Sequence, residues 1–97
     1  MKSFKKIAVI GKYSSIEGSS DVREQLNILI SHLQQKGFDL VLENKTQQQF
    51  KFDNMPSMSL KEIRTEVDLA IVVGGDGTML GVARSIFDTG IPLIGIN

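Results

Sequence analysis

The sequence predicts an α/β fold, a three-layer sandwich in which helices cover both faces of a mostly parallel sheet. Short, continuously apolar segments of the kind that form strands buried on both faces support this prediction. Segments with helical spacing of apolar residues separate them, and strands that alternate with helices form parallel sheets with right-handed crossovers. We expect four buried strands, at residues 7–10, 38–43, 69–73 and 91–96.

The composition is that of one soluble globular domain. The chain has 97 residues, and 41% of them are hydrophobic and 23% charged, which are ordinary values for such domains. A chain of this length buries a single modest core, so we expect a thin stability margin that a partner would widen.

Charge and cysteine usage exclude several function classes. The 11 basic and 11 acidic side chains give a formal net charge of zero, so we expect neither nucleic acid nor an anionic membrane as a partner. The absence of cysteine excludes disulfides and cysteine nucleophiles and agrees with a reducing compartment. The longest apolar run, residues 69–73, is too short to span a bilayer, and the N-terminus lacks a signal-peptide hydrophobic region. We therefore expect a cytoplasmic protein.

The first half of the chain predicts a strand–helix–strand unit. The first strand, at residues 7–10, is closed by Gly11. A helix follows, with Ser20 or Asp21 placed to cap its start and Gly37 as its C-terminal stop. The apolar residues at helical spacing are Val22, Leu26, Leu29, Ile30 and Leu33. The second strand follows directly.

Residues 44–58 predict a long loop. They contain three consecutive glutamines and a proline and show no sustained period, which is typical of a mobile or functional connection. We expect Phe50, Phe52 and Met55 within it to pack locally.

The second half predicts two more strands and two helices. Ser59 and Glu62 have the spacing of a capping box, so a short helix starts there. The strand at residues 69–73 runs directly into a glycine-rich turn and a helix that ends at Gly90. Pro92 stands at the start of the last strand, where its missing N–H is tolerated.

The carboxyl ends of the strands are the expected ligand site, because ligands bind at that edge of open α/β sheets. The sequence places there the loop after Gly11, the turn at residues 74–78 and Asn97. The chain stops after its last strand without a helix or strand to cover the new edge, so we expect it to be a piece of a longer protein.

The turn Gly74-Gly75-Asp76-Gly77-Thr78 predicts a phosphate site. Its glycines allow positive φ and bring backbone N–H groups against a ligand without an intervening β-carbon. The helix that follows adds free N–H groups and the positive end of its dipole, which favour a phosphate or pyrophosphate. Thr78 adds a hydroxyl donor in the first helical turn.

Asp76 does not suit a simple phosphate cradle. A carboxylate beside a phosphate opposes the ligand unless it bonds a hydroxyl, accepts a proton or holds a divalent cation. These roles indicate phosphoryl transfer, in which a base deprotonates the accepting hydroxyl and magnesium neutralises the phosphate. The alternative is that Asp76 only caps the helix through backbone N–H groups.

Other nucleotide-binding motifs fit less well. The turn lacks the Gly-Lys-Ser/Thr ending of a P-loop, and Gly75, Gly77 and Gly81 miss the dinucleotide fingerprint by one residue. Gly81 then indicates close packing of its helix on the sheet. Glu43 has little claim as a ribose-binding acid, because the turn after the first strand carries no glycine fingerprint.

Three other polar residues have plain explanations. His32 lies among polar positions without partners at metal-ligand spacing, so we expect a surface histidine. Lys12 and Tyr13 follow the first strand and could approach a ligand, but an ordinary loop role is favoured.

The turn and the last strand together resemble the N-terminal domain of NAD kinases. The resemblance is carried by residues 72–80, VVGGDGTML, and by residues 91–97, IPLIGIN. The turn alone is shared with lipid kinases and, in a close variant, with phosphofructokinases, whereas the last strand is more typical of NAD kinases. The resemblance extends in layout over all 97 residues and implies a Rossmann-like, phosphofructokinase-like domain.

The resemblance implies ATP-dependent phosphorylation of the 2′-hydroxyl on the adenosine ribose of NAD to give NADP, with Mg²⁺ as the divalent cation. Asp76 would be the general base, and Gly77 would contact NAD. Gly74, Gly75 and Thr78 would approach the nucleotide phosphates. The implied nucleotide-binding residues are Gly74, Gly75, Asp76, Gly77, Thr78 and Asn97.

The resemblance also implies that residues 1–97 are an N-terminal domain with half a site. The family's Asn-Glu motif and β-rich C-terminal domain would lie beyond residue 97, and Gly81 stands where many family members carry a basic residue. Small-molecule nucleotides are the implied partners, with a homo-oligomer, a dimer or tetramer, for the complete protein. Two alternatives stay open: a nucleotide-binding fragment without catalysis, and part of a lipid or sugar kinase that shares the turn.

Overall fold

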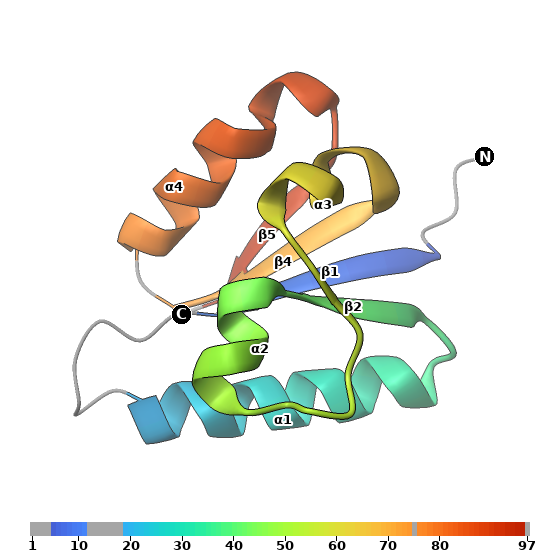
Figure 1. Cartoon of the computed structure of the whole chain (residues 1–97), viewed down its shortest axis with the longest axis vertical. Coiled ribbons are helices and arrows are strands. Elements are labelled where there is room, and N and C mark those ends of the chain that lie inside the picture. Colours follow the sequence, from blue (N-terminus) through green and yellow to red (C-terminus); the bar gives the residue numbers. More distant parts are fainter. Residues whose placement is uncertain (1–4, 12–18, 75, 97) are drawn as a thin grey trace.

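The computed structural model describes residues 5–11, 19–74 and 76–96 (Figure 1). Within these residues, helices alternate with strands along the chain. Their bounds are β1 Lys6–Gly11, α1 Ser19–Gln35, β2 Asp39–Glu43, α2 Asn44–Phe50, β3 Ser57–Met58, α3 Leu60–Glu66, β4 Leu69–Val73, α4 Asp76–Ile86, the 3-10 helix η1 Phe87–Thr89, and β5 Leu93–Ile96.

The described strands form one five-stranded parallel sheet in the order β3-β2-β1-β4-β5. The central strand β1 pairs with β2 on one side and with β4 on the other. Ile7 is opposite Leu69, and the pairing continues in step to Gly11 opposite Val73. The carboxyl ends of β1 and β4 therefore meet at the same edge.

Helices cover both faces of the sheet, which confirms the predicted three layers. Successive residues of β1 belong to different core clusters, as the alternation of side chains along a strand requires. One cluster packs the sheet against α1 and contains Val9 and Leu26. The other packs it against α3 and α4 and contains Ile10, Ile63 and Val82. Figure 1 shows α1 below the sheet and α4 above it.

Residues 44–58 form a helix and a strand, so the prediction of a long loop was wrong. Thr46 and Phe50 are the buried residues of α2. The Glu43 side chain caps the helix by accepting two backbone N–H groups of its first turn, and Lys51 ends it in the left-handed conformation, with φ at 58°. Two buried side chains make one helical turn and no sustained period, so the pattern did not reveal this helix.

The strand β3 was not predicted either. It has two residues and pairs with residues 42–43 of β2. A strand of this length is too short to show alternation. Phe50 of α2 belongs to the core cluster on the α1 side, and Phe52 and Met55, between α2 and β3, pack against that cluster. They are packing residues, as predicted, but they join the main core and do not pack only locally.

The helix ends were predicted more closely. Ser59 and Glu62 form the capping box of α3, with the Glu62 N–H donating to the Ser59 hydroxyl at 3.1 Å. Gly37 and Gly90 have positive φ, 88° and 79°, where helical segments end. None of the helices in the described ranges is long and apolar enough to cross a membrane.

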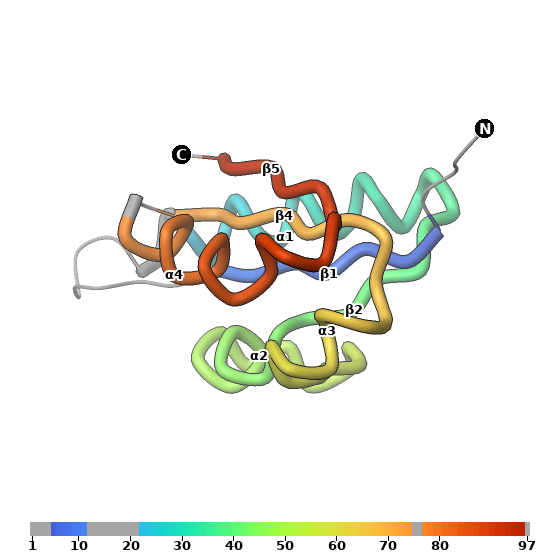
Figure 2. Tube along the Cα trace, turned by 90° about the horizontal axis from the view of Figure 1, so that it is seen from above, coloured from blue at the N-terminus to red at the C-terminus, as the bar shows by residue number. Residues whose placement is uncertain are grey.

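The edge strand β5 is less buried than predicted. Ile94 is 46% exposed and Ile96 is 37% exposed. The strand forms one edge of the sheet, with β3 at the other edge, and in Figure 2 it lies on the far side of the sheet from α2 and α3. The helix α1 packs chiefly under β1, β2 and β4. On its other face, Gly95 lies against Met79 of α4. One face of β5 is therefore covered and the other is open.

Candidate functional site

The candidate site lies where the chain leaves β1 and β4, at the carboxyl edge of the sheet. From β1 the chain crosses one face through α1 to β2, and from β4 it crosses the other face through α4 to β5. Adjacent strands whose connections turn to opposite sides leave a crevice outside their carboxyl ends, where ligands of such sheets bind. The strand order therefore supports the predicted location of the site.

The glycine turn borders this crevice. Gly74 follows β4 directly, and α4 begins at Asp76. Gly74 has a φ of 141°, which a residue with a β-carbon rarely adopts. Its N–H donates to the carbonyl oxygen of Ile96 at 3.0 Å. The turn thus connects strand to helix as predicted and lies beside the end of β5.

The structure describes part of the predicted nucleotide site. Gly77 and Thr78 lie in the first turn of α4 and line a cavity. Gly75, Asn97 and the side chain of Asp76 lie outside the part of the chain that the structure describes, so their roles stay predictions. The predictions for Lys12 and Tyr13 also fall outside it. The prediction that Ser20 or Asp21 caps the first helix was wrong, because α1 begins at Ser19 and both residues lie inside it.

The cavity beside Gly77 and Thr78 has a volume of about 570 Å³, which is in the range of small-molecule sites. It lies between the carboxyl ends of β1 and β2 and the first turns of α2, α3 and α4. Sequence analysis did not predict it, because two of its walls belong to the segment interpreted as a loop and to the helix that follows. Described residues of its lining include Glu43, Lys45, Lys61, Gly77, Thr78 and Gly81.

Thr46, which sequence analysis did not single out, connects α2 to the end of β1. Its Oγ1 accepts the N–H of Gly11 at 3.0 Å and lies 2.9 Å from the carbonyl oxygen of Gly11. The same oxygen lies 3.1 Å from Oε1 of Glu43, so its hydroxyl hydrogen has two neighbouring acceptors. Thr46 is fully buried. This network holds Gly11 at the edge of the cavity.

Glu43 serves as the cap of α2. It is 8% exposed, and its Oε2 accepts the N–H of Lys45 at 3.0 Å while its Oε1 accepts that of Thr46 at 3.1 Å. Since both carboxylate oxygens already accept hydrogen bonds from the chain, the structure agrees that Glu43 has little claim as a ribose-binding acid.

Gly81 does not pack closely on the sheet, so that prediction was wrong. A β-carbon added to Gly81 would meet no atom within 4 Å. Close approach occurs at other glycines: a β-carbon on Gly11 would lie 2.8 Å from Cδ1 of Leu26, and one on Gly95 would lie 3.2 Å from Sδ of Met79. Gly81 lines the cavity instead.

Two lysines give the cavity positive charge. Lys45 lies in the first turn of α2 and Lys61 in that of α3, and both are exposed. The ion pair found among the described residues joins Arg64 to Asp88, so neither lysine is neutralised within that part of the chain. The described residues also contain no group of three or more His, Cys, Asp or Glu side chains suited to a metal ion. The cavity therefore suits an anionic ligand.

The sequence profile of the ATP-NAD kinase N-terminal domain matches residues 9–97. The chain belongs to this family. The matched range includes the glycine turn, the carboxyl ends of β1 and β4 beside the crevice, and the five described strands except residues 6–8 of β1. It confirms the resemblance inferred from the turn and the last strand, and it favours NAD kinases over the lipid and sugar kinases that share the turn.

Curated relatives named NAD kinase agree with the family match. The chain is 37% identical over 94 residues to the protein of Cupriavidus pinatubonensis, an alignment that covers 97% of the chain and 30% of the relative. It is 42% identical over 94 residues to that of Nitrosomonas europaea, with the same coverage of 97% and 30%. For Polaromonas sp. (strain JS666) the identity is 42% over 98 residues, covering 100% of the chain and 32% of the relative. The chain thus spans about 30% of the length of these NAD kinases.

Proposed function

We propose that the protein containing this chain transfers a phosphoryl group from ATP to the 2′-hydroxyl on the adenosine ribose of NAD, giving NADP. The family match over residues 9–97 carries the proposal, because the matched range includes the glycine turn at the crevice. The chain spans about 30% of its relatives, so we propose that it is an N-terminal domain supplying part of the site and that further chain completes it.

Asp76 is the general base in this proposal. Its carboxylate takes the proton of the 2′-hydroxyl, the freed oxygen attacks the γ-phosphorus of ATP, and ADP leaves. Asp76 is the first residue of α4, so the free N–H groups of the same helix end stabilise the negative charge of the transferred phosphate. Gly74, Gly75 and Thr78 hold the nucleotide phosphates beside it.

The phosphoryl acceptor, NAD, binds beside the glycine turn. Gly77 contacts NAD, and Asn97 follows β5, whose last described carbonyl already bonds the Gly74 N–H. The hydrogen bond supports the assignment, because it joins the end of β5 to the start of the turn.

Mg²⁺ is the proposed divalent cation. Proteins usually bind this ion through substrate phosphates together with one or two carboxylates, and we assign it no ligand within this chain. When bound, the ion would neutralise charge on the transferred phosphate.

We further propose a cytoplasmic, homo-oligomeric protein. The absence of cysteine in the chain agrees with a reducing compartment. The exposed Ile94 and Ile96 are apolar surface of the kind that further chain or a second copy covers.

The substitution Asp76→Asn tests the role of the carboxylate. A complete enzyme for this test is a chimera in which the chain replaces the matching 94 residues of the Nitrosomonas europaea NAD kinase. We expect turnover to fall by about 10²–10⁴-fold, the usual contribution of a positioned base, while NAD affinity changes little. Steady-state kinetics and calorimetric titration with NAD measure the two quantities.

The control for this substitution is Asp39→Asn. Asp39 is the exposed first residue of β2. It lies at the amino ends of the strands, whereas the turn lies at their carboxyl ends, so its loss should leave turnover unchanged. Near-normal turnover of the Asp76→Asn chimera would instead assign Asp76 to helix capping.

A further inference from the structure

The carboxyl end of β1 extends beyond its neighbour β2. The last residue of β1 in register with β2 is Val9, opposite Leu42, whereas the pairing with β4 continues to Gly11. The chain passes from β2 into α2 directly after Glu43, so the described part of β2 does not reach Gly11. Gly11 is buried, and buried backbone polar groups need partners. On the β2 side, Gly11 therefore needs a partner that is not a strand.

Thr46 supplies this partner with a single oxygen atom. Its Oγ1 accepts the N–H of Gly11 at 3.0 Å and lies 2.9 Å from the carbonyl oxygen of the same residue. Thr46 is fully buried, and a buried hydroxyl is costly unless it forms hydrogen bonds. Valine has nearly the same shape, so packing alone would favour valine at this position. The contact with Gly11 accounts for the hydroxyl.

Glu43 fixes the orientation of Thr46. Its Oε1 accepts the backbone N–H of Thr46 and lies 3.1 Å from Oγ1 of the same residue. Its Oε2 accepts the N–H of Lys45. Glu43 is the last residue of β2, and Thr46 lies in the first turn of α2. These two side chains thus join the ends of β2 and β1 to the start of α2.

The end of β1 is in turn paired with the strand that carries the glycine turn. Gly11 is opposite Val73, the last residue of β4. Gly74 follows Val73, and α4 begins at Asp76. A displacement of Gly11 would therefore pass through Val73 to the turn. A misplacement of about 1 Å at a reacting group can cost about 10²-fold in rate, so the position of Gly11 bears on the geometry of the transfer.

We propose that Thr46 is a positioning residue for phosphoryl transfer. Its hydroxyl fixes the end of β1 and, through Val73, holds the glycine turn in the arrangement in which Asp76 acts. Since Thr46 is fully buried, it acts through these neighbours and not on a substrate. This inference rests on the proposed function, in which Asp76 is the general base. Loss of the hydroxyl should lower turnover and leave substrate binding nearly unchanged.

The substitution Thr46→Val in the chimera tests this role, because valine keeps the shape and removes the hydroxyl. We expect kcat to fall about tenfold, while KM for NAD and for MgATP stays within about twofold. Thr46→Ser keeps the hydroxyl and should retain most of the turnover. Kinetics are measured at a temperature at which circular dichroism shows every variant to be folded. Wild-type kcat in the valine variant, or a serine variant as slow as the valine variant, would overturn the proposal.

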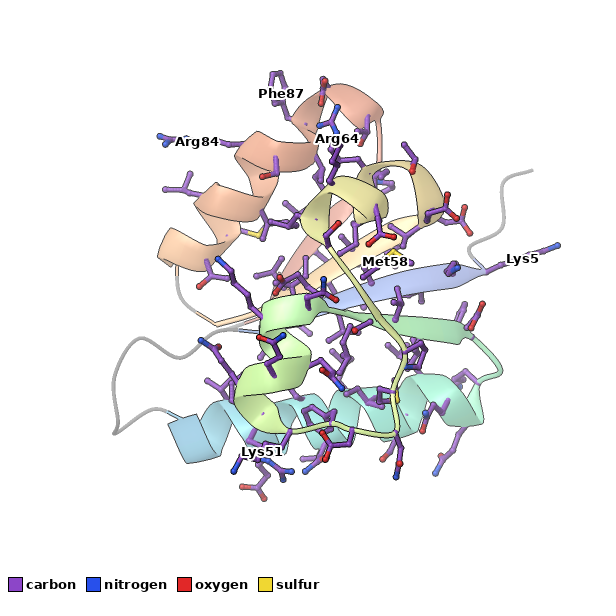
Figure 3. All side chains as sticks on the ribbon, viewed as in Figure 1. Lys5, Lys51, Met58, Arg64, Arg84 and Phe87 are labelled. Carbon is purple, nitrogen blue, oxygen red and sulfur yellow. The ribbon has the colours of Figure 1, made fainter. Side chains whose placement is uncertain are left out.

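Asp68→Ala is the matched control, because Asp68 holds the other end of β1 in the same manner. Its Oδ2 accepts the backbone N–H groups of Lys5 and Lys6, each at 3.0 Å. Lys5 directly precedes β1 at its amino end (Figure 3), whereas the glycine turn lies at the carboxyl ends of the strands. The control should lose stability and keep its kcat. An equal fall of kcat in the control would show that any loosening of β1 slows the reaction, and the proposal would fail.

Amide NMR spectra of the 97-residue chain test the structural link without the reaction. In Thr46→Val, the N–H of Gly11 loses its acceptor and should exchange with solvent at least about tenfold faster. The amide resonance of Gly74 should shift, because the turn follows the end of β1. Asp68→Ala should change neither signal. An unshifted Gly74 resonance in the folded valine variant would contradict the proposal.

Two further outcomes also decide the matter. A wild-type chimera that forms no NADP would count against the proposed reaction, whereas the Gly74 resonance would still decide whether Thr46 positions the turn. If Thr46→Val does not fold, Thr46→Ala removes the same hydroxyl with a smaller side chain, and the same results are expected for it. Failure of both variants to fold would assign Thr46 to folding alone and overturn the proposal.

Discussion

Gly11, Gly74 and Gly81 are glycines for different physical reasons. A β-carbon on Gly11 would come within 2.8 Å of Cδ1 of Leu26, a fully buried side chain of α1. Gly74 has a φ of 141°, which disfavours any side chain. Gly81 has neither constraint and lines the cavity. Close packing, backbone conformation and open space thus account for one glycine each.

Alanine substitutions at Gly11 and Gly81 should therefore have opposite effects on stability. We predict that Gly11→Ala lowers the free energy of unfolding by about 1–3 kcal/mol, because the extra methyl group overpacks the core at Leu26. Gly81→Ala should raise it by about 0.5–1 kcal/mol, because alanine favours the helix and meets no neighbour. Urea denaturation of both variants measures the difference. Effects of the same sign would show that the described packing of one of them is incorrect.

Sequence analysis singled out candidate site residues where a motif carries them and missed cavity-lining residues that depend on the fold. The glycine turn stood out because glycines allow positive φ, as Gly74 shows, and Asp76 because a carboxylate opposes a phosphate. Thr46 lies 35 positions from Gly11, which it contacts, and no local pattern announces such a pair. Lys45 and Lys61 converge only when α2 and α3 are in place.

Among the elements, those with strong apolar patterns were predicted and those without were not. β1, β2 and β4 are continuous apolar runs, and α1 and α4 carry several turns of periodic apolar residues. The helix α2 buries two side chains, and β3 has two residues, so neither forms a pattern. β5 has the composition of a buried strand, but its open face depends on which strands α1 covers.

The elements α3 and η1 are joined by an ion pair. The guanidinium of Arg64 donates to both carboxylate oxygens of Asp88, at 2.8 and 3.1 Å, and also to the carbonyl oxygen of Ser85. The hydrogen bonds from Arg64 hold the pKa of Asp88 below its ordinary value. A carboxyl group with a depressed pKa in the folded state stabilises the fold above its unfolded pKa, and that contribution is lost as the pH falls through the folded pKa.

The substitution Asp88→Asn should remove this pH-dependent contribution. We predict that the variant melts at a slightly lower temperature than the wild type near neutral pH. The difference should shrink as the pH falls below about 4 and disappear below the folded pKa of Asp88, where the carboxyl is protonated in both states. Circular dichroism melts across this range at low salt measure it. Asp53→Asn is the matched control, because Asp53 is exposed in the segment between α2 and β3. A difference that persisted unchanged in acid would contradict the ion-pair account.

For the whole molecule, strand order and layers bring the elements of the candidate site to one edge of the sheet. The carboxyl ends of β1 and β4 meet there, and the N–H of Gly74 bonds the end of β5. The same edge strand leaves Ile94 and Ile96 exposed. NAD kinase relatives extend well beyond the part that the chain matches. We propose that this further chain lies beside β5 and supplies the groups that position NAD.

The most direct test of the account is NADP formation by the chimera and by the 97-residue chain, each supplied with NAD and MgATP. We predict that the chimera forms NADP. The chain alone should form none, because transfer requires both substrates to be held in position and part of that shell lies outside it. A folded chimera that forms no NADP, or NADP formation by the chain alone, would contradict the claim that this chain supplies the phosphoryl-transfer half of an NAD kinase.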